Sequence, residues 1–342
     1  MPSIDVNTFL TTMYCKIDDW YQAEMAVQKP VRPGPEPEVS DSEVLTLALL
    51  REWLDEPVSE AGFLALVAQH WRRYFPRLLG QSSFNRRVRD LWGVLCVLAP
   101  VVGCWLRTLQ PPSAYAVADA VPVPLMRVCR GRRHRLFGPE ADVGIGGSDK
   151  DLYYGVKLLL EVTQQGAITG FILGPAATQE RWLLEALLRY RQDPAAPAPS
   201  AAEAVQFLGP SHHRGGGRVG PTGPLGPRCA VGTLRAVADL GDLGFSGTAW
   251  QLHWLHAYGT AVLTKDAYPD PRHRARFAHF RQVIETVNGF LVDRLHLKYP
   301  RVRTLASLYA RVAAKIATYH FMLLDNLDHD RPALARPTPL LS

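Results

Sequence analysis

Hydrophobic positions recur at helical spacing in the first part of the chain. Ser40 is followed three residues later by Glu43, which forms a capping box ahead of the apolar run 44–54. Ser59 is placed to cap a second helix that continues to Trp71. Two helices joined by a short connection are therefore predicted between residues 40 and 71.

A third helix is predicted after the break at residues 76–80, with Ser82 or Ser83 as its cap. Its apolar positions recur at spacings of three and four, as on one face of a helix. They are Phe84, Val88, Leu91, Trp92 and Leu95. We therefore expect an all-helical N-terminal domain over residues 1–112, which ends at a proline-rich boundary.

The period changes after this boundary, where short β-prone runs alternate with helical segments. We expect an α/β fold in which a five-stranded sheet is flanked by helices. The segment 193–232 is rich in proline, glycine and alanine, which indicates an insertion or a disordered loop. The predicted strands are 114–118, 153–162, 167–173, 234–238 and 260–264, and the predicted helices are 179–190, 247–258 and 274–295.

Composition narrows the class of protein. The chain has 342 residues, of which 47% are apolar, and is long enough for two domains. Its five cysteines form no paired framework and the N-terminus lacks a signal-like segment, which favours a reducing cytoplasm. No apolar run reaches the roughly 20 residues of a membrane span, so no membrane partner is expected.

Basic residues gather in three arginine-rich clusters, although the net charge is only +6. The planar fork of arginine matches phosphate, so the clusters favour a polyanionic partner, with a solvated helix face as the alternative for each. In the first cluster, the third predicted helix carries arginines on its outer face, as helix-turn-helix DNA readers do; a plain helical bundle fits equally. The arginines selected in the first two clusters are Arg86, Arg87 and Arg89, and Arg132, Arg133 and Arg135.

Three acidic residues occupy positions that suit a metal site. Asp119 ends the first predicted strand, Asp242 follows the fourth, and Glu285 lies inside the last predicted helix. A lone acid at any of these places is more often a solvated one. Together, three carboxylates can bind two Mg²⁺ or Mn²⁺ ions, because these cations prefer oxygen ligands. Asp239 offers the same Asp-x-Gly pattern as Asp242 and stands closer to the strand end.

The element order and four local motifs resemble the ribonuclease H-like catalytic domain of DDE transposases from bacterial insertion sequences. The resemblance extends over roughly residues 40–327 and favours Asp242 over Asp239, because an aromatic residue and a glycine follow Asp242 as in the family turn. The motifs are Asp-Ala-Val-Pro-Val at 119–123, Tyr-Gly-Val-Lys at 154–157, Asp-Leu-Gly-Phe at 242–245 and Arg-Gln-Val-Ile-Glu at 281–285.

This resemblance implies a mixed sheet, a catalytic domain over residues 113–327 and a C-terminal tail over 328–342. It also implies DNA cleavage and strand transfer at terminal inverted repeats, by a cytoplasmic, nucleoid-associated homodimer that engages double-stranded repeat ends and target DNA. The implied metal ligands and catalytic acids are Asp119, Asp242 and Glu285, which would hold two Mg²⁺ (or Mn²⁺) ions. Arg281 is the implied catalytic arginine, with an ordinary surface pair with Glu285 as the alternative. Lys157 and Arg294 are implied DNA contacts, and a strand-edge lysine is the alternative for Lys157.

The chain also differs from the family pattern. Ala-Thr-Gln-Glu at 177–180 stands where the family often has a His-Asp pair, and Ala278 and Val292 stand where related enzymes have tyrosine and lysine. Two alternative functions remain open. One is an inactive or domesticated DNA-binding protein, and the other is a metal-dependent nuclease on the same fold.

Overall fold

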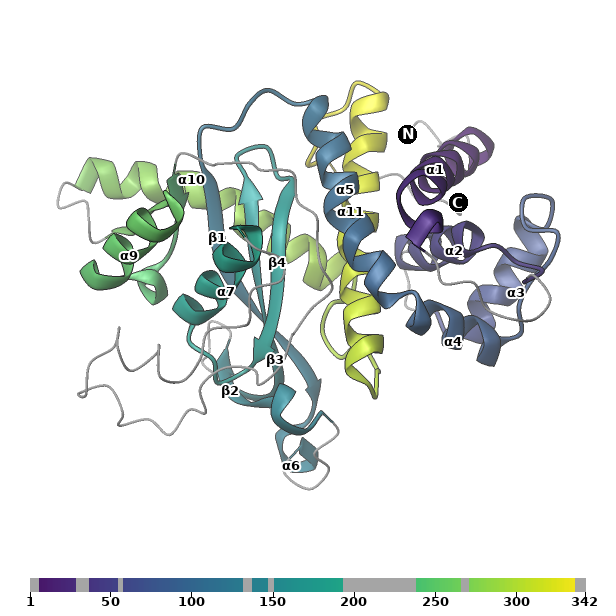
Figure 1. Cartoon of the computed structure of the whole chain (residues 1–342), viewed down its shortest axis with the longest axis horizontal. Helices are drawn as coiled ribbons and strands as arrows, with labels where there is room; N and C mark the ends of the chain where they lie inside the picture. The colour runs from purple at the N-terminus through teal and green to yellow at the C-terminus, as the bar shows by residue number, and fades with distance from the viewer. Residues whose placement is uncertain are drawn as a thin grey trace. The chain divides into compact units, whose positions relative to one another are not determined.

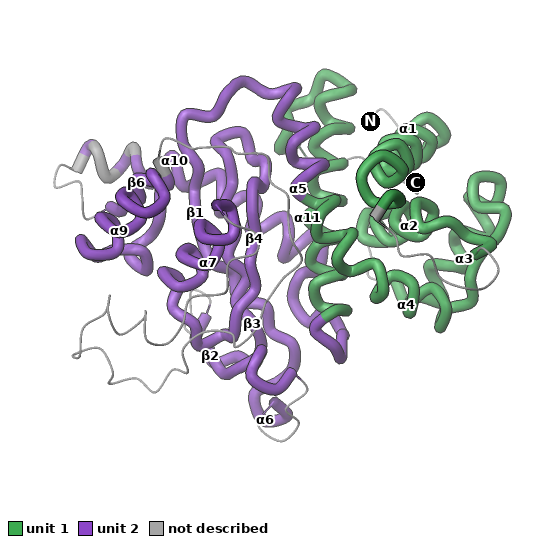
Figure 2. Tube along the Cα trace, viewed as in Figure 1, with its two compact units in different colours: residues 1–99, 306–342 green, residues 100–305 purple. Residues whose placement is uncertain are grey.

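The computed structural model describes residues 6–28, 37–54, 58–131, 137–146, 151–192, 238–265 and 271–335 (Figure 1). The chain forms two compact units (Figure 2): Met1–Ala99 with Ala306–Ser342, and Pro100–Leu305. The predicted domains divided the chain at residues 112 and 327 instead. The C-terminal helix belongs with the N-terminal helices because its buried polar side chains bond to them, as for Thr318, which donates to the backbone carbonyl of Leu49 at 3.0 Å.

Unit 1 is helical, and two of its helices begin as predicted. Ser40 Oγ accepts a hydrogen bond from the Glu43 amide at 3.1 Å, and the Glu43 carboxylate accepts one from the Ser40 amide, which completes the capping box. Ser59 caps the next helix. The third predicted helix is present, but its predicted serine cap is wrong, because the helix starts after an extended Gly80 without a side-chain cap. The helices are α1 (Val6–Trp20), α2 (Asp41–Trp53), α3 (Glu60–His70), α4 (Gln81–Asp90), the first part of α5 (Trp92–Thr108) and α11 (Leu305–Asp328), with a π-helical turn at Tyr21–Met25 and a 3₁₀ turn at Ala26–Gln28.

No helix in the described ranges is by itself long and apolar enough to cross a membrane. Only α4 and α5 taken together reach that length and composition, and they are bent by 66° at their junction.

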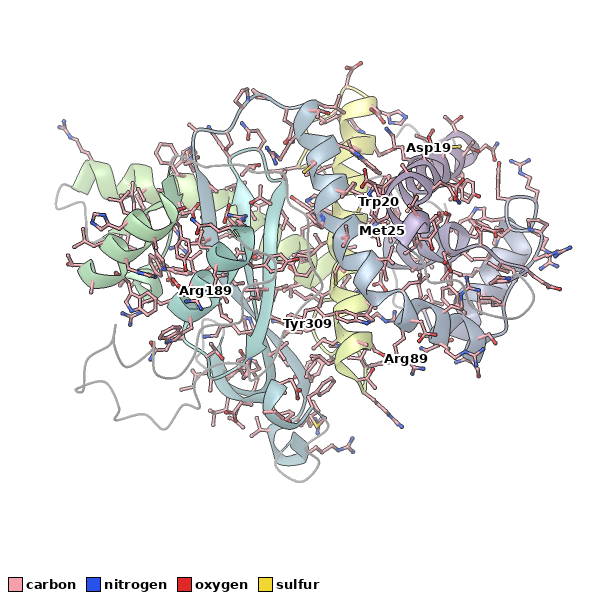
Figure 3. All side chains as sticks on the ribbon, viewed as in Figure 1. Asp19, Trp20, Met25, Arg89, Arg189 and Tyr309 are labelled. Atoms are coloured by element: carbon pink, nitrogen blue, oxygen red, sulfur yellow. The ribbon has the colours of Figure 1, made fainter. Side chains whose placement is uncertain are left out.

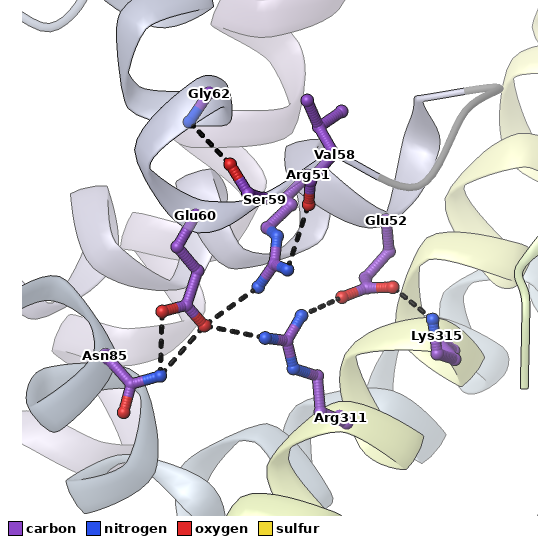
Figure 4. Close-up of polar contacts among 9 residues, drawn as sticks. All are labelled: Arg51, Glu52, Val58, Ser59, Glu60, Gly62, Asn85, Arg311 and Lys315. Atoms are coloured by element: carbon purple, nitrogen blue, oxygen red, sulfur yellow. Dashed lines mark hydrogen bonds and ion pairs between the residues drawn. The ribbon is translucent and has the colours of Figure 1, made fainter. Parts of the chain in front are cut away.

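A buried network of charges joins α2 and α11 (Figure 4). Arg311 donates to Glu52 at 3.0 Å and to Glu60 at 2.7 Å, while Lys315 pairs with the other oxygen of Glu52. Burial alone would raise the pKa of Glu52, but the charges of Lys315 and Arg311 outweigh it and lower that pKa to about 2. The other side chains that bond to Glu60 are Arg51 and Asn85.

Replacing Glu52 by glutamine is expected to destabilise unit 1 by roughly 3–5 kcal/mol, because it leaves Lys315 charged and buried without its closest anion. Thermal unfolding of the full chain measures the effect, with Asp19→Asn on the exposed side of α1 (Figure 3) as the control. Adding Lys315→Met should recover part of the loss. Because the pKa of Glu52 is lowered, its contribution is full above about pH 4.5 and is lost as the pH falls toward 2. Unfolding of Glu52→Gln at the wild-type temperature would show that the network adds no stability.

Unit 2 is built on a mixed six-stranded sheet (Figure 1). The order is β2-β3-β1-β5-β6, and β4 shares one edge of the long strand β3 with β2. Strand β3 is antiparallel to β1, β2 and β4, whereas β5 is parallel to both β1 and β6. The strands are β1 (Ala116–Met126), β2 (Asp142–Gly146), β3 (Asp151–Thr163), β4 (Ile168–Pro175), β5 (Ala238–Leu240) and β6 (Ala261–Leu263).

The sheet corrects two sequence predictions. Its described residues form six strands rather than five, because the glycine-rich segment that forms β2 carried little strand signal. Gly144 is needed there, since an added Cβ would lie only 2.6 Å from the carbonyl oxygen of Ala176. Strand β1 also continues past residue 118 through Pro122 and Pro124. Among the described strands, β5 pairs only with Ala116 and Val117 of β1. The β5 edge of β1 is therefore unpaired at both prolines, and the N–H that proline lacks is not needed there.

Helices cover both faces of the sheet (Figure 1). Ala118 and Leu159 pack with Trp182, Leu184 and Trp250 of α7 and α9 on one face. The other face meets α10, which buries Ile284 and Val287. Phe280 of the same helix is 38% exposed, and its ring packs at a tilt against Tyr115. The unit's helices are the second part of α5, α6 (Val128–Gly131), α7 (Glu180–Gln192), α9 (Thr248–Tyr258) and α10 (Pro271–Gly289, followed by a π turn at Phe290–Arg294), with 3₁₀ turns at Gly138–Glu140 and Leu243–Phe245.

Candidate active site

Asp119 lies in the middle of β1, not at its end as expected, on the face that α10 covers. Successive side chains of a strand alternate between faces, and Ala118 packs against α7 on the opposite face. Asn288 of α10 donates to Asp119 Oδ2 at 3.0 Å, and Arg281 Nη2 lies 3.6 Å from Oδ1. The carboxyl is therefore held from α10 by one amide and one guanidinium, and it remains 21% exposed.

The electrostatic environment of Asp119 reveals its acidic neighbours. Burial is the main effect that raises the pKa of Asp119, to about 6, and the Arg281 charge opposes it. The charges of Asp242 and Glu285 add to the rise, so both carboxylates lie close enough to repel it. The three predicted acids come from a strand, a turn and a helix, and the charges of Asp242 and Glu285 both act on Asp119.

Asp242 follows β5 and begins a 3₁₀ turn. Its Oδ1 accepts from the Gly244 amide at 2.7 Å, so the side chain caps that turn and is held in one orientation. Because β5 runs parallel to β1, the residues after β5 emerge alongside the middle of β1, where Asp119 lies.

Asp239 lies on the other face of the sheet. It is aligned with Ala116, which shares its face with Ala118, so its side chain points away from Asp119. Burial, together with the Glu161 charge, raises the pKa of Asp239 well above its usual value. It is 1% exposed, and neither carboxyl oxygen has a hydrogen-bond partner among the described residues. Of the two Asp-x-Gly acids, Asp242 is the one whose charge acts on Asp119.

Glu285 and Arg281 stand one turn apart on α10. Glu285 is exposed, whereas Arg281 is only 17% exposed and turns toward Asp119. Asn288 completes the stripe at i+7, so a single helix face presents a carboxylate, a guanidinium and an amide. Arg281 is thus part of the acidic site rather than an exposed surface residue.

Sequence reasoning missed a fourth acid, Glu180, the first residue of α7. Burial and the charge of Asp242 raise the pKa of Glu180 to about 7, and Lys157 opposes the rise. Lys157 Nζ lies 3.6 Å from Glu180 Oε1 and donates to the carbonyl of Thr178 at 3.1 Å. Its position in the sequence could have indicated it, because Glu180 ends the 177–180 segment, where the transposase family often has a His-Asp pair.

The donor set fits a hard divalent cation, because carboxylate oxygens are the ligands that such cations prefer. A Cβ added at Gly244 would overlap Glu180 Oε2 and lie 2.9 Å from Asp242 Oδ1, so both carboxylates lie close to the Gly244 backbone, which has no side chain. Within the described ranges, however, no three Asp, Glu, His or Cys side chains already converge as a metal-binding group. Closer convergence of these carboxylates would require their side chains to reorient.

No protein-family model, curated protein or solved structure matches this chain. The resemblance to transposases therefore rests on the sequence motifs.

The predicted DNA-contacting residues fall in different environments. Arg86 is exposed on α4, and Arg89 (Figure 3) is half-buried. Arg87 was expected on the outer face of that helix but donates to Asp41 at 2.6 Å and to the carbonyl of Val39, because it follows the buried Phe84 by one turn. Arg294 is half-buried in the π turn after α10. Arg132, Arg133 and Arg135 lie outside the described residues.

Proposed function

We propose that this chain is a DDE-class DNA transposase with a ribonuclease H-like catalytic unit. The observation that carries the proposal is that Asp119 on β1 is bonded by α10, the helix that carries Glu285, while Asp242 follows β5, the strand parallel to β1. The sheet supports the fold assignment, since an acid on the central strand and a second acid after its parallel neighbour follow the order of the family motifs. The reaction would be cleavage and strand transfer at terminal inverted repeats of double-stranded DNA.

Asp119, Asp242 and Glu285 would hold two Mg²⁺ or Mn²⁺ ions. The chemistry that the ions supply when bound is activation of a water or a DNA 3′-hydroxyl and stabilisation of the leaving oxygen. Asn288 fixes the orientation of the Asp119 carboxyl through its 3.0 Å hydrogen bond. Arg281 would turn its fork to the scissile phosphate, where two parallel N–H donors can orient the backbone and offset charge on the phosphoryl oxygens.

The helical unit and the basic residues would supply DNA affinity, and a homodimer would bring two ends together. The proposal is tested by searching the DNA that flanks the gene for inverted repeats and incubating the purified full chain with them in Mg²⁺. Cleavage at the repeat ends supports a transposase. Cleavage without regard to the repeats supports another metal-dependent nuclease, and binding without cleavage supports an inactive or domesticated DNA-binding protein.

Arg86 and Arg87 offer a matched pair for testing DNA binding. Arg86→Ala is expected to weaken binding to repeat DNA and to flatten its dependence on salt by about one unit, because one phosphate contact is lost. Arg87→Ala is expected to lower the unfolding temperature, because Asp41 is buried and loses its ion pair. Fluorescence anisotropy at several salt concentrations, with thermal unfolding alongside, measures both effects. An unchanged salt slope for Arg86→Ala would place the phosphate contacts outside the start of α4.

A further inference from the structure

Glu180 and Lys157 form an ion pair beside Asp242, although neither residue belongs to the three-acid set. Glu180 begins α7, and Lys157 lies on β3 with its ammonium 3.6 Å from Glu180 Oε1. Both side chains are less than a quarter exposed. Water therefore screens their charges only partly, and those charges act on their neighbours more strongly than a surface pair would.

The position of Lys157 is set by the sheet. Strand β3 is paired on both sides here, since Lys157 is aligned with Pro122 of β1 and Gly174 of β4. Its side chain shares a face with Leu159, which packs against α7, and this directs the ammonium to the start of that helix. Lys157 is therefore not an edge lysine in solvent, but a cation held against an acid.

The position of Glu180 is set by a glycine. A Cβ at Gly244 would overlap Glu180 Oε2 and come within 2.9 Å of Asp242 Oδ1. Because glycine has no side chain, both carboxylates can lie next to its backbone. The Gly244 amide donates to Asp242. Glu180 thus brings a further negative charge to Asp242, and Lys157 is the cation that offsets it.

We propose that Glu180 and Lys157 act as a pair that sets the affinity of the acidic site for divalent cations. Glu180 strengthens cation binding beside Asp242, and Lys157 weakens it by occupying the same carboxylate. This inference rests on the proposed function, because it assumes that Asp119, Asp242 and Glu285 bind the cation. Glu180 and Lys157 are positioning residues here, since they act through the field at Asp242.

The test is titration of the full chain with Mn²⁺ at about pH 8, where Glu180 is ionised because its pKa is about 7. DNA is absent, and the free ion is followed by electron paramagnetic resonance. Glu180→Gln is expected to weaken Mn²⁺ binding on the order of tenfold, and Lys157→Met to strengthen it severalfold. The double variant keeps the net charge of the wild-type pair and should bind within about twofold of wild type. A purely structural role would not produce opposite signs, because both single variants would then weaken binding.

Mn²⁺ binding that is unchanged in Glu180→Gln, or weakened in Lys157→Met, would overturn the inference. Lys157→Met gives a second route if Glu180→Gln does not fold, because damage to the site would weaken Mn²⁺ binding, whereas the inference predicts stronger binding. Asp119→Asn and Asp242→Asn distinguish a failure of this inference from a failure of the proposed function. If they weaken Mn²⁺ binding and Glu180→Gln does not, only this inference fails; if they leave it unchanged, the proposed function fails.

Discussion

Replacing Asp119 by asparagine is expected to abolish Mg²⁺-dependent strand cleavage, with a loss of at least about a thousandfold in the single-turnover rate. Asparagine keeps the shape of the side chain and can still accept the hydrogen bond from Asn288. It removes the negative charge that would balance a divalent ion. Burial of that charge is the main reason why the pKa of Asp119 is raised to about 6, so Asp119→Asn should unfold at the wild-type temperature or above it.

Single-turnover cleavage of repeat DNA, with DNA binding measured in parallel, separates loss of chemistry from loss of affinity. Gln282→Ala serves as the control, because Gln282 is an exposed neighbour of Arg281 on α10 and is neither a proposed ligand nor a proposed catalytic residue. Glu285→Gln should behave like Asp119→Asn. Cleavage by Asp119→Asn within tenfold of wild type would mean that the centre of β1 carries no catalytic acid.

Removal of the Arg281 side chain should have the second largest effect. Arg281→Ala is expected to lower the single-turnover rate by roughly a hundredfold to a thousandfold, the usual cost of losing one donor that stabilises charge in the transition state. Arg281→Lys should keep part of the rate, since lysine retains the charge but cannot donate two parallel bonds to a phosphate. Repeat binding should change little in either variant.

The two variants also test how Arg281 acts. The buried residues of α10, such as Ile284 and Val287, lie on another face of the helix, so thermal unfolding should stay close to wild type. Equal rates for Arg281→Ala and wild type would make Arg281 a structural partner of Asp119, held 3.6 Å from its carboxyl, without a part in cleavage.

Local signals in the sequence predicted local structure well. The capping box at Ser40 is a three-residue pattern, and the structure contains it with both hydrogen bonds. Alternation between strand and helix likewise predicted most elements of unit 2. The strands that contain glycines or prolines were predicted incorrectly. Strand β2 depends on a close backbone approach at Gly144, and the second half of β1 on an unpaired edge, and composition reveals neither.

Long-range relations were beyond the sequence. Asp239 and Asp242 carry the same Asp-x-Gly pattern, and only the alignment of Asp239 with Ala116 shows that it faces away from Asp119. Glu180 meets Asp242 because α7 and the turn at Gly244 pack together, although they are far apart in the chain. Likewise, the bonds from α11 to α2 place the C-terminal helix in unit 1, which a linear division at residue 112 could not anticipate.

The comparison of Asp242→Asn with Asp239→Asn tests the central claim most directly. Both substitutions remove one carboxylate from the same short segment, but the charge of Asp242 acts on Asp119, whereas Asp239 is buried on the opposite face. We predict that in Mg²⁺ Asp242→Asn binds repeat DNA without cleaving it, while Asp239→Asn cleaves at a rate close to wild type. Cleavage by Asp242→Asn together with inactivity of a folded Asp239→Asn would contradict the proposed active site.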